Sequence, residues 1–330
     1  MSNIDFVILW VDGNDPKWKA EKERYTKTKL NDINRFRDWD NLKYWFRGVE
    51  KFAPWVNKIH FITYGHIPKW LNVDNSKLDI VKHMDYIPEK YLPTFNSNVI
   101  ELNLHRLKQL SEQFVLFNDD MFLCKEVKEE EFFKNGLACE MYAENINMPL
   151  GYNNTFSHTA LNNIGIINKH FNKREVMKKN LGKYLNIKYG IDNLRTIFLL
   201  PWPHYSQFKD PHLPVSLLKS NLSMLWEKEK EALNITSCNK FRQSTDINQY
   251  LIRYWQLLTG NFYPRNSKIG KYFEIKNQNE QLLEVIKKQK YKMICINDVT
   301  ETINVDFERV KSEINNAFEK ILPSKSSFEI

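Results

Sequence analysis

Short apolar runs that each stop at turn residues constrain the fold of this chain most strongly. Three of them span residues 4–10, 58–64 and 114–117 and are followed by Asp12-Gly13, by Gly65 and by Asn118-Asp119-Asp120. Runs of this length that end at such residues are typical of buried strands. A weaker run covers residues 78–81. The pattern predicts four short strands in the first 120 residues.

Helical patterns separate these strands. Apolar residues recur at helical spacing over residues 40–52, before Pro54, and over residues 98–113, after the capping residues Asn96 and Ser97. Strands that alternate with helices predict an α/β fold, in which ligands bind at the carboxyl ends of the strands.

The second half of the chain has mostly helical sequence patterns. Residues 160–195, 214–233, 246–259 and 306–321 read as helices, and residues 293–296 form a short strand-like piece. We therefore expect an α/β core over residues 1–140 and a mostly helical part over residues 141–330, packed with the core as one unit.

The net charge of +8 favours anionic partners, although charged runs are usually solvated helix faces. No apolar stretch is long enough to span a membrane, and the N-terminus lacks the features of a signal peptide. We expect a cytoplasmic protein. The four cysteines form no paired motif, which predicts reduced, buried thiols.

Asp119 and Asp120 form an acidic pair at the end of an apolar run. Two adjacent carboxylates are costly to hold together unless a cation neutralises them, and Mg²⁺ prefers one or two carboxylates together with phosphate oxygens. A turn or helix cap explains the pair equally well. Asp12 and Asp15 also follow a strand. In a loop close to a nucleotide they would contact a ribose hydroxyl or the metal shell, and the alternative is an Asx turn closed by Pro16.

Other candidate residues come from helices and loops. Glu101 and His105 are four residues apart on the expected helix over residues 98–113, so they would share a face as base or phosphate contact, or form a surface pair. His212 lies between Pro211 and Pro214 in a stiff loop, where it suits proton removal or a structural hydrogen bond. Arg242 is a candidate phosphate ligand, with a surface salt bridge as the alternative.

The order of these motifs resembles that of the Stealth family, bacterial capsular-polysaccharide phosphotransferases related to the enzyme that adds N-acetylglucosamine-1-phosphate to lysosomal glycoproteins. The resemblance rests on four blocks: residues 4–16, with Trp10-Val11-Asp12-Gly13-Asn14-Asp15-Pro16; residues 35–120, with Leu92-Pro93-Thr94-Phe95-Asn96-Ser97-Asn98 and Phe117-Asn118-Asp119-Asp120; Pro211-His212-Leu213-Pro214; and residues 241–256, with Phe241-Arg242 and Asp246-Ile247-Asn248-Gln249-Tyr250.

The resemblance implies a fold like that of nucleotide-sugar transferases, a Rossmann-like mixed sheet with added helices. It also implies transfer of a sugar-1-phosphate from a UDP-sugar to a hydroxyl of a polysaccharide acceptor, with release of UMP. On this hypothesis Asp119 and Asp120 bind Mg²⁺ or Mn²⁺, and Asp12 and Asp15 contact the nucleotide, with Asp38 and Arg47 nearby. His212 is the general base, Arg242 neutralises the phosphoryl group, and Glu101 and His105 line the site.

Two other functions remain open at this stage. A conventional glycosyltransferase would attack the anomeric carbon and release UDP, and it would need the same metal-bound diphosphate. A non-catalytic protein that binds polyanions or glycans would suit the charge, but it leaves the acidic pairs unexplained, because carboxylates repel polyanions. We expect no nucleic-acid partner. The acceptor could be lipid-linked, and the positive charge suggests peripheral attachment to the inner face of the cell membrane.

Overall fold

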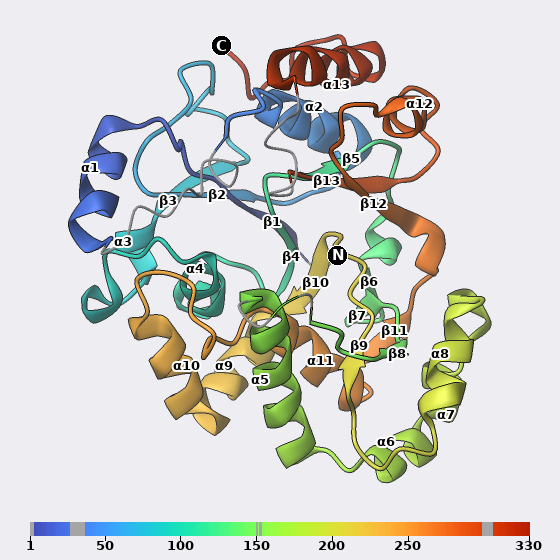
Figure 1. Cartoon of the computed structure of the whole chain (residues 1–330). Helices are drawn as coiled ribbons and strands as arrows, with labels where there is room; N and C mark the ends of the chain where they lie inside the picture. The colour runs from blue at the N-terminus through green and yellow to red at the C-terminus, as the bar shows by residue number, and fades with distance from the viewer. Residues whose placement is uncertain (1–2, 27–36, 150, 152–153, 299–305) are drawn as a thin grey trace.

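A five-stranded sheet forms the centre of the protein (Figure 1). The computed structural model describes residues 3–26, 37–149, 151, 154–298 and 306–330. The strand order is β10-β4-β1-β2-β3, and only β10 is antiparallel to its neighbour. The strands are β1 (Ile4–Leu9), β2 (Ile59–Thr63), β3 (Leu78–Lys82), β4 (Gln113–Phe117) and β10 (Val215–Leu218).

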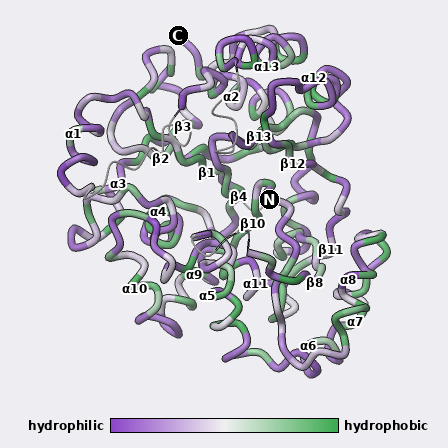
Figure 2. The backbone as a smooth tube through the Cα atoms, viewed as in Figure 1, coloured by the Kyte–Doolittle hydropathy of each residue, from purple (hydrophilic) through white to green (hydrophobic). Residues whose placement is uncertain are grey.

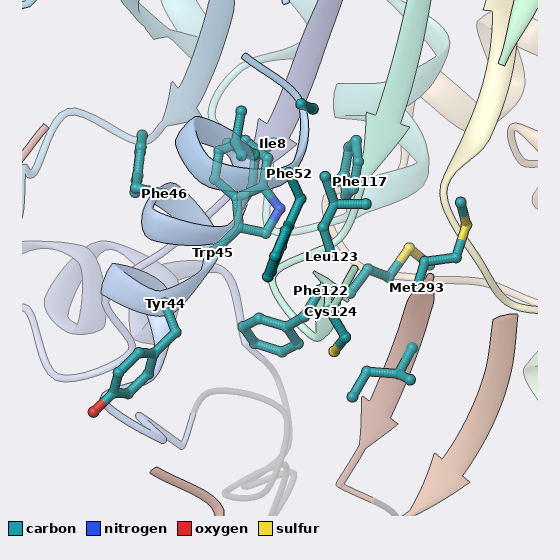
Figure 3. Packing of buried hydrophobic residues seen from close by; sticks show 14 of the residues in the cluster. Ile8, Tyr44, Trp45, Phe46, Phe52, Phe117, Phe122, Leu123, Cys124 and Met293 are labelled. Atoms are coloured by element: carbon teal, nitrogen blue, oxygen red, sulfur yellow. The ribbon is translucent and has the colours of Figure 1, made fainter. Parts of the chain in front are cut away.

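Alternating side chains of the sheet supply two hydrophobic clusters, one on each face, because successive residues of a strand point to opposite sides. Phe6 and Ile8 of β1 belong to the first cluster, whereas Val7 belongs to the second. The first cluster packs under helices α2 (Leu42–Phe52), α12 (Glu280–Lys287) and α13 (Phe307–Ile321). Figure 3 shows part of it, with Trp45 and Phe52 of α2 beside Phe117 of β4. This three-layer arrangement confirms the expected α/β fold with a mixed sheet.

The second cluster lies under a set of helices that come mostly from the second half of the chain. They are α4 (Ser97–Leu102), α5 (Thr155–His170), α9 (Lys219–Lys228), α10 (Lys230–Cys238) and α11 (Tyr250–Leu258). The remaining helices are α1 (Pro16–Tyr25), α3 (His83–Tyr86), α6 (Lys173–Lys179), α7 (Leu181–Tyr184) and α8 (Asp192–Leu199).

Small sheets join segments that are distant in sequence. One has the order β12-β13-β5, a second β11-β7-β6, and β8 pairs with β9. Their strands are β5 (Met121–Leu123), β6 (Phe133–Lys134), β7 (Leu137–Glu140), β8 (Glu144–Asn145), β9 (Gln207–Phe208), β11 (Phe262–Pro264), β12 (Gly270–Glu274) and β13 (Met293–Asn297).

Four sequence-based predictions are wrong in detail. The stretch 160–195 is not one helix, because it contains the end of α5, the whole of α6 and α7, and the start of α8. The helix expected over residues 98–113 ends at Leu102, and a separate 3₁₀ turn follows at residues 104–106. The helix expected over residues 214–233 begins only at Lys219, because residues 215–218 form β10. Cys238 is exposed, whereas the other three thiols are buried as expected. Since β10 joins the central sheet, the part after residue 140 contributes directly to the core, and the boundary at residue 140 stays a prediction.

A buried ion cluster ties β1, β2 and β3 together. His60 of β2 is completely buried, and its two ring nitrogens lie 3.1 Å from Asp5 and 2.7 Å from Asp79. Asp5 also accepts hydrogen bonds from the Asn57 amide and the Ser111 backbone. Burial favours neutral imidazole, but the two carboxylates outweigh it and raise the pKa of His60.

Candidate active site at the carboxyl ends of β1 and β4

The antiparallel pairing of β10 with β4 brings two distant motifs together. Val215 is paired with Leu116, so the residues that precede β10 lie at the same edge of the sheet as those that follow β4. His212 therefore lies beside Asp120, close enough for the two groups to influence each other's pKa. The predicted metal carboxylates and the predicted base belong to one site.

β13 adds a thiol that the sequence analysis did not identify as a site residue. Cys295 pairs with Met121 across β13 and β5, and its Sγ lies 3.3 Å from Oδ2 of Asp120. One ligand atom each of Asp120, His212 and Cys295 lies within 4.8 Å of the other two. No CxxC spacing marks Cys295; only the tertiary fold places it here.

The chemistry of the adjacent carboxylates Asp119 and Asp120 fits a divalent cation. Oδ1 of Asp120 is buried and has no hydrogen-bond partner among the residues that the structure describes. The pKa of Asp119 is raised to about 7, mainly because nearby protein atoms desolvate its carboxyl, although the residue remains exposed to solvent. The negative charges of Asp120 and Asp38 raise it as well. Burial also raises the pKa of Asp120, against the opposing effect of His212. Neighbouring carboxylates that repel one another and hold an unused oxygen are suited to a bound cation.

His212 is held in an uncommon conformation. Its φ is +50°, in the left-handed region that β-carbon-bearing residues rarely adopt, and its Nδ1 lies 3.2 Å from the Tyr250 hydroxyl. The ring of Tyr272 meets the imidazole edge-on at 5.4 Å. Burial, despite the nearby Asp120, lowers the pKa of His212, so the imidazole is neutral near pH 7 and able to accept a proton.

Helix α11 anchors the loop that carries His212. Arg253 of α11 is fully buried and donates to Asp210, two residues before His212, at 2.8 Å. The Tyr254 hydroxyl donates to the same carboxylate at 2.5 Å. Tyr250, Arg253 and Tyr254 are spaced three and four residues apart, so they share one face of the helix. This face fixes the position of the imidazole.

Arg242 interacts electrostatically with both Glu101 and His212. Nη2 of Arg242 donates to Oγ of Ser97 at 2.7 Å. Burial raises the pKa of Glu101 to about 7, although Arg242, the Gln249 backbone amide and Ser97 all favour its charged form. The structure thus brings Glu101, Arg242 and His212 into one electrostatically coupled group.

The buried carboxylate of Asp246 holds together the segments that carry Glu101 and Arg242. Asp246 accepts hydrogen bonds from the side-chain amides of Asn96, Asn98 and Asn239, at 2.8, 3.2 and 2.7 Å. These contacts join the residues on either side of Ser97 to those on either side of Arg242. The second and fourth shared motifs of the sequence therefore act as one structural unit.

His105 does not join Glu101. The turn at Asn103 interrupts the helix, and the imidazole lies against Trp226, with ring centroids 5.7 Å apart. Arg106 covers the same indole at 4.7 Å. The expectation that Glu101 and His105 share a helical face is wrong, and we leave His105 out of the proposed site.

Arg47 forms its hydrogen bonds with the C-terminal segment of the chain. It donates to the carboxylates of Glu319 and Glu329 and to the Leu322 carbonyl, at 2.8–3.0 Å, and it is buried. These bonds use most of its donors, so we also leave Arg47 out of the site. Asp38, in contrast, is close enough to Asp119 to affect the pKa of that carboxyl.

Asp12 and Asp15 follow β1, beside β4, and shape the turn into α1. Asp12 accepts a hydrogen bond from the Asn14 backbone at 2.8 Å, and Asp15 caps α1 by accepting one from the Trp18 backbone at 2.7 Å. Nε2 of His66 accepts a hydrogen bond from the Asp12 backbone. Both carboxylates act electrostatically on His66, so they lie on the side of the site nearer to β2.

A hollow of about 350 Å³ opens on this side. Tyr64, His83 and Thr94 are among the residues that line it, and the rings of Tyr64 and His66 lie 6.0 Å apart. Tyr64 and His83 give the hollow an aromatic wall, which suits a nucleoside, because its base can stack there.

Comparisons with known proteins identify the family of this chain. Residues 35–140 match the model of Stealth protein conserved region 2, and residues 2–29 match that of conserved region 1. A capsular polysaccharide phosphotransferase of Streptococcus pneumoniae is 49% identical over 100% of this chain and 98% of its own length. An exopolysaccharide phosphotransferase of Lactiplantibacillus plantarum is 42% identical over 99% of this chain and 96% of its own. A receptor polysaccharide phosphotransferase of Streptococcus gordonii is 40% identical over 100% of both chains.

Solved structures give weaker matches. The WbbM bifunctional glycosyltransferase aligns with a TM-score of 0.40 and 9% identity over 97% of this chain and 51% of its own. The galactosyltransferase LgtC, in complex with donor and acceptor sugar analogues, aligns with a TM-score of 0.38 and 8% identity over 94% and 95%. The full-length matches to the phosphotransferases, together with the two family regions, show that this chain belongs to the Stealth family.

Proposed function

We propose that the protein transfers a hexose-1-phosphate or N-acetylhexosamine-1-phosphate from a UDP-sugar to a hydroxyl of a polysaccharide acceptor. The bond between the acceptor oxygen and the phosphorus next to the sugar forms, and the bond from that phosphorus to the bridging oxygen breaks. UMP leaves with the bridging oxygen. The full-length relatives are named as polysaccharide phosphotransferases, which supports this reaction class. The observation that carries the proposal is the convergence of Asp120, His212 and Cys295 at one sheet edge.

Each group has a distinct part in this proposal. Asp119 and Asp120 hold Mg²⁺ or Mn²⁺, which when bound would neutralise charge on the diphosphate oxygens. His212 accepts the proton of the attacking hydroxyl, since its lowered pKa leaves it neutral near pH 7. Arg242 faces the transferring phosphoryl group, and Glu101 holds Arg242 in place. Phosphoryl transfer depends mainly on such positioning and charge compensation.

The nucleotide occupies the hollow beside β2 and β3. Asp12 and Asp15 accept hydrogen bonds from the ribose, and Tyr64 stacks on the base. Asp38, next to Asp119, lies where the diphosphate would cross from this hollow to the acceptor side. On this proposal the hollow binds the nucleoside, the acidic pair the diphosphate, and the imidazole and guanidinium act on the acceptor side.

The setting we propose is the cytoplasmic face of the cell membrane, with a lipid-linked acceptor. Among the described residues, no helix has both the length and the apolar character to cross a bilayer.

The identity of the released nucleotide tests the reaction. Purified protein is incubated with UDP-sugars, an acceptor oligosaccharide and Mg²⁺, and the nucleotide product is identified by chromatography. UMP supports the proposal. UDP would assign a conventional glycosyltransferase, and no product with any donor would favour a non-catalytic binding protein.

Two variants test the residues. Asp120→Ala and His212→Ala should each lower turnover by about a hundredfold or more while the fold is kept. Asp74→Ala is the matched control, because this exposed carboxylate precedes β3 at the opposite edge of the sheet. Near-normal turnover in both site variants would show that the assigned roles are wrong.

A further inference from the structure

Helix α8 has its apolar side turned outward. Asp192 and Thr196, four residues apart, face the protein and are buried, whereas Ile191, Leu194 and Phe198 are exposed. Ile191 is 81% exposed and Phe198 71%. A helix on the surface of a water-soluble domain normally shows the opposite arrangement. The exposed stripe is therefore suited to an apolar partner.

Neighbouring segments extend this surface. Leu181 of α7, Ile187 in the following turn and Trp202 after α8 are also exposed, Ile187 to 92%. Figure 2 shows α7 and α8 at the periphery of the molecule, where hydrophobic residues alternate with hydrophilic ones. We call these residues the α8 surface: Leu181, Ile187, Ile191, Leu194, Phe198 and Trp202.

Basic side chains surround the α8 surface. Residues 169–202 contain eight Lys and Arg but only two acidic residues. One of these acids, Asp192, is neutralised internally by Lys209 at 2.8 Å. Arg174, Lys178 and Lys179 are exposed on the adjacent helix α6. The region thus combines exposed aromatic and aliphatic groups with a local excess of positive charge.

We propose that the α8 surface docks on an anionic phospholipid bilayer. Aliphatic and aromatic side chains enter the boundary between head groups and acyl chains, Trp being especially suited to this depth, while lysines and arginines contact lipid phosphates. Charge argues against a second copy as the occupant, because a two-fold contact through this surface would bring two basic regions together.

The α8 surface is connected to the active site by a short path. Lys209, which pairs with Asp192 of α8, is three residues before His212, and Asp210 between them is anchored to α11. Docking through α8 would hold the loop that carries the proposed base at a constant distance from the bilayer. This inference rests on the proposed function only in assuming a lipid-linked acceptor there.

Vesicle sedimentation of the full chain tests the docking. Neutral vesicles contain phosphatidylcholine alone, and anionic vesicles contain roughly one third phosphatidylglycerol. The wild-type protein should sediment with anionic vesicles at low salt and much less with neutral ones. The double variant Phe198→Ser with Trp202→Ser should bind about tenfold more weakly, because it removes the two exposed aromatic anchors. Lys178→Glu with Lys179→Glu should weaken anionic binding to a similar extent, about tenfold.

Ile235→Ser is the matched control, since Ile235 is exposed on α10, a helix remote from α8 (Figure 1). Unchanged sedimentation of both double variants would overturn the proposal. The proposal would also be overturned if the wild-type protein bound no vesicles, formed a dimer in analytical ultracentrifugation and became a monomer in the aromatic variant. That result would assign the surface to contact with a second copy of the chain.

UMP release with a soluble oligosaccharide acceptor separates the two proposals. The variants of the α8 surface should keep this activity, because none of the changed residues lies in the site. Vesicle binding without any UMP release would defeat the proposed function and leave the docking proposal intact.

Discussion

Replacing Arg253 by Met should unfold the protein at a much lower urea concentration and remove its activity. The guanidinium is completely buried and donates to Glu140 at 2.9 Å, to Asp210 at 2.8 Å and to the Met141 carbonyl at 2.9 Å. Met fills a similar volume but leaves two buried carboxylates short of a cation. Breaking a buried ion pair from one side typically costs about 3–5 kcal/mol.

The size of the stability loss in Arg253→Met depends on a neighbouring arginine, Arg265. Arg265 still donates to Glu140 at 3.0 Å, so Glu140 keeps one cation. Asp210 keeps the hydrogen bond from the Tyr254 hydroxyl but has no second cation among the described residues. We therefore expect a loss of about 4 kcal/mol for Arg253→Met, mostly from Asp210, within the 5–15 kcal/mol that is usual for the whole of a folded domain. Arg265→Met is the matched control and should cost about 2 kcal/mol, because it removes a single contact to one carboxylate.

The loss should depend on pH in a defined direction. Burial already raises the pKa of Asp210 to about 6, and Arg253 opposes this rise. Without Arg253 the folded-state pKa of Asp210 rises further. The variant therefore loses stability as the pH rises above the pKa of Asp210 in the unfolded chain, near 4. It regains this stability when the pH is lowered and the carboxyl is protonated. Urea unfolding followed by circular dichroism, at about pH 5 and about pH 8, measures the difference. Equal losses in the two arginine variants, or a larger deficit at the lower pH, would refute this reasoning.

Two further results are expected. Tyr250→Phe should lower kcat about fivefold to tenfold with little change in stability, since it removes only the hydroxyl next to the imidazole of the site, a bond of about 1 kcal/mol; an unchanged kcat and pH profile would remove Tyr250 from any positioning role. His60→Gln should cost about 3 kcal/mol at pH 5.5 and clearly less near pH 9. The pKa of His60 is raised in the folded state, so its ion pairs stabilise the fold fully below the unfolded pKa near 6.5, and this stabilisation is lost as the pH rises through the folded pKa. The pKa of Asp5 is lowered, so Asp5 stays charged and paired down to strongly acidic pH. A pH-independent difference between wild type and variant in urea midpoints would contradict the charged pairing with Asp5 and Asp79.

Local patterns in the sequence determined the sheet and the acids at its edge. The apolar runs 4–10, 58–64 and 114–117 correspond to β1, β2 and β4, because a short run buried on both faces contains few polar residues whatever surrounds it. The acids that follow β1 and β4 lie at one edge, because parallel neighbours end on the same side.

The tertiary structure alone decided which distant residues meet these acids. Residues 215–218 resemble the start of a helix, yet they pair with β4, and that pairing places His212 beside Asp120. Cys295 reaches the same point through β13. Arg47, which the family resemblance assigned to the nucleotide end, is instead buried among C-terminal acids. Periodicity and turn residues depend on neighbours within a few positions. Long-range pairing depends instead on the burial and charge complementarity of the whole chain, which no local window contains.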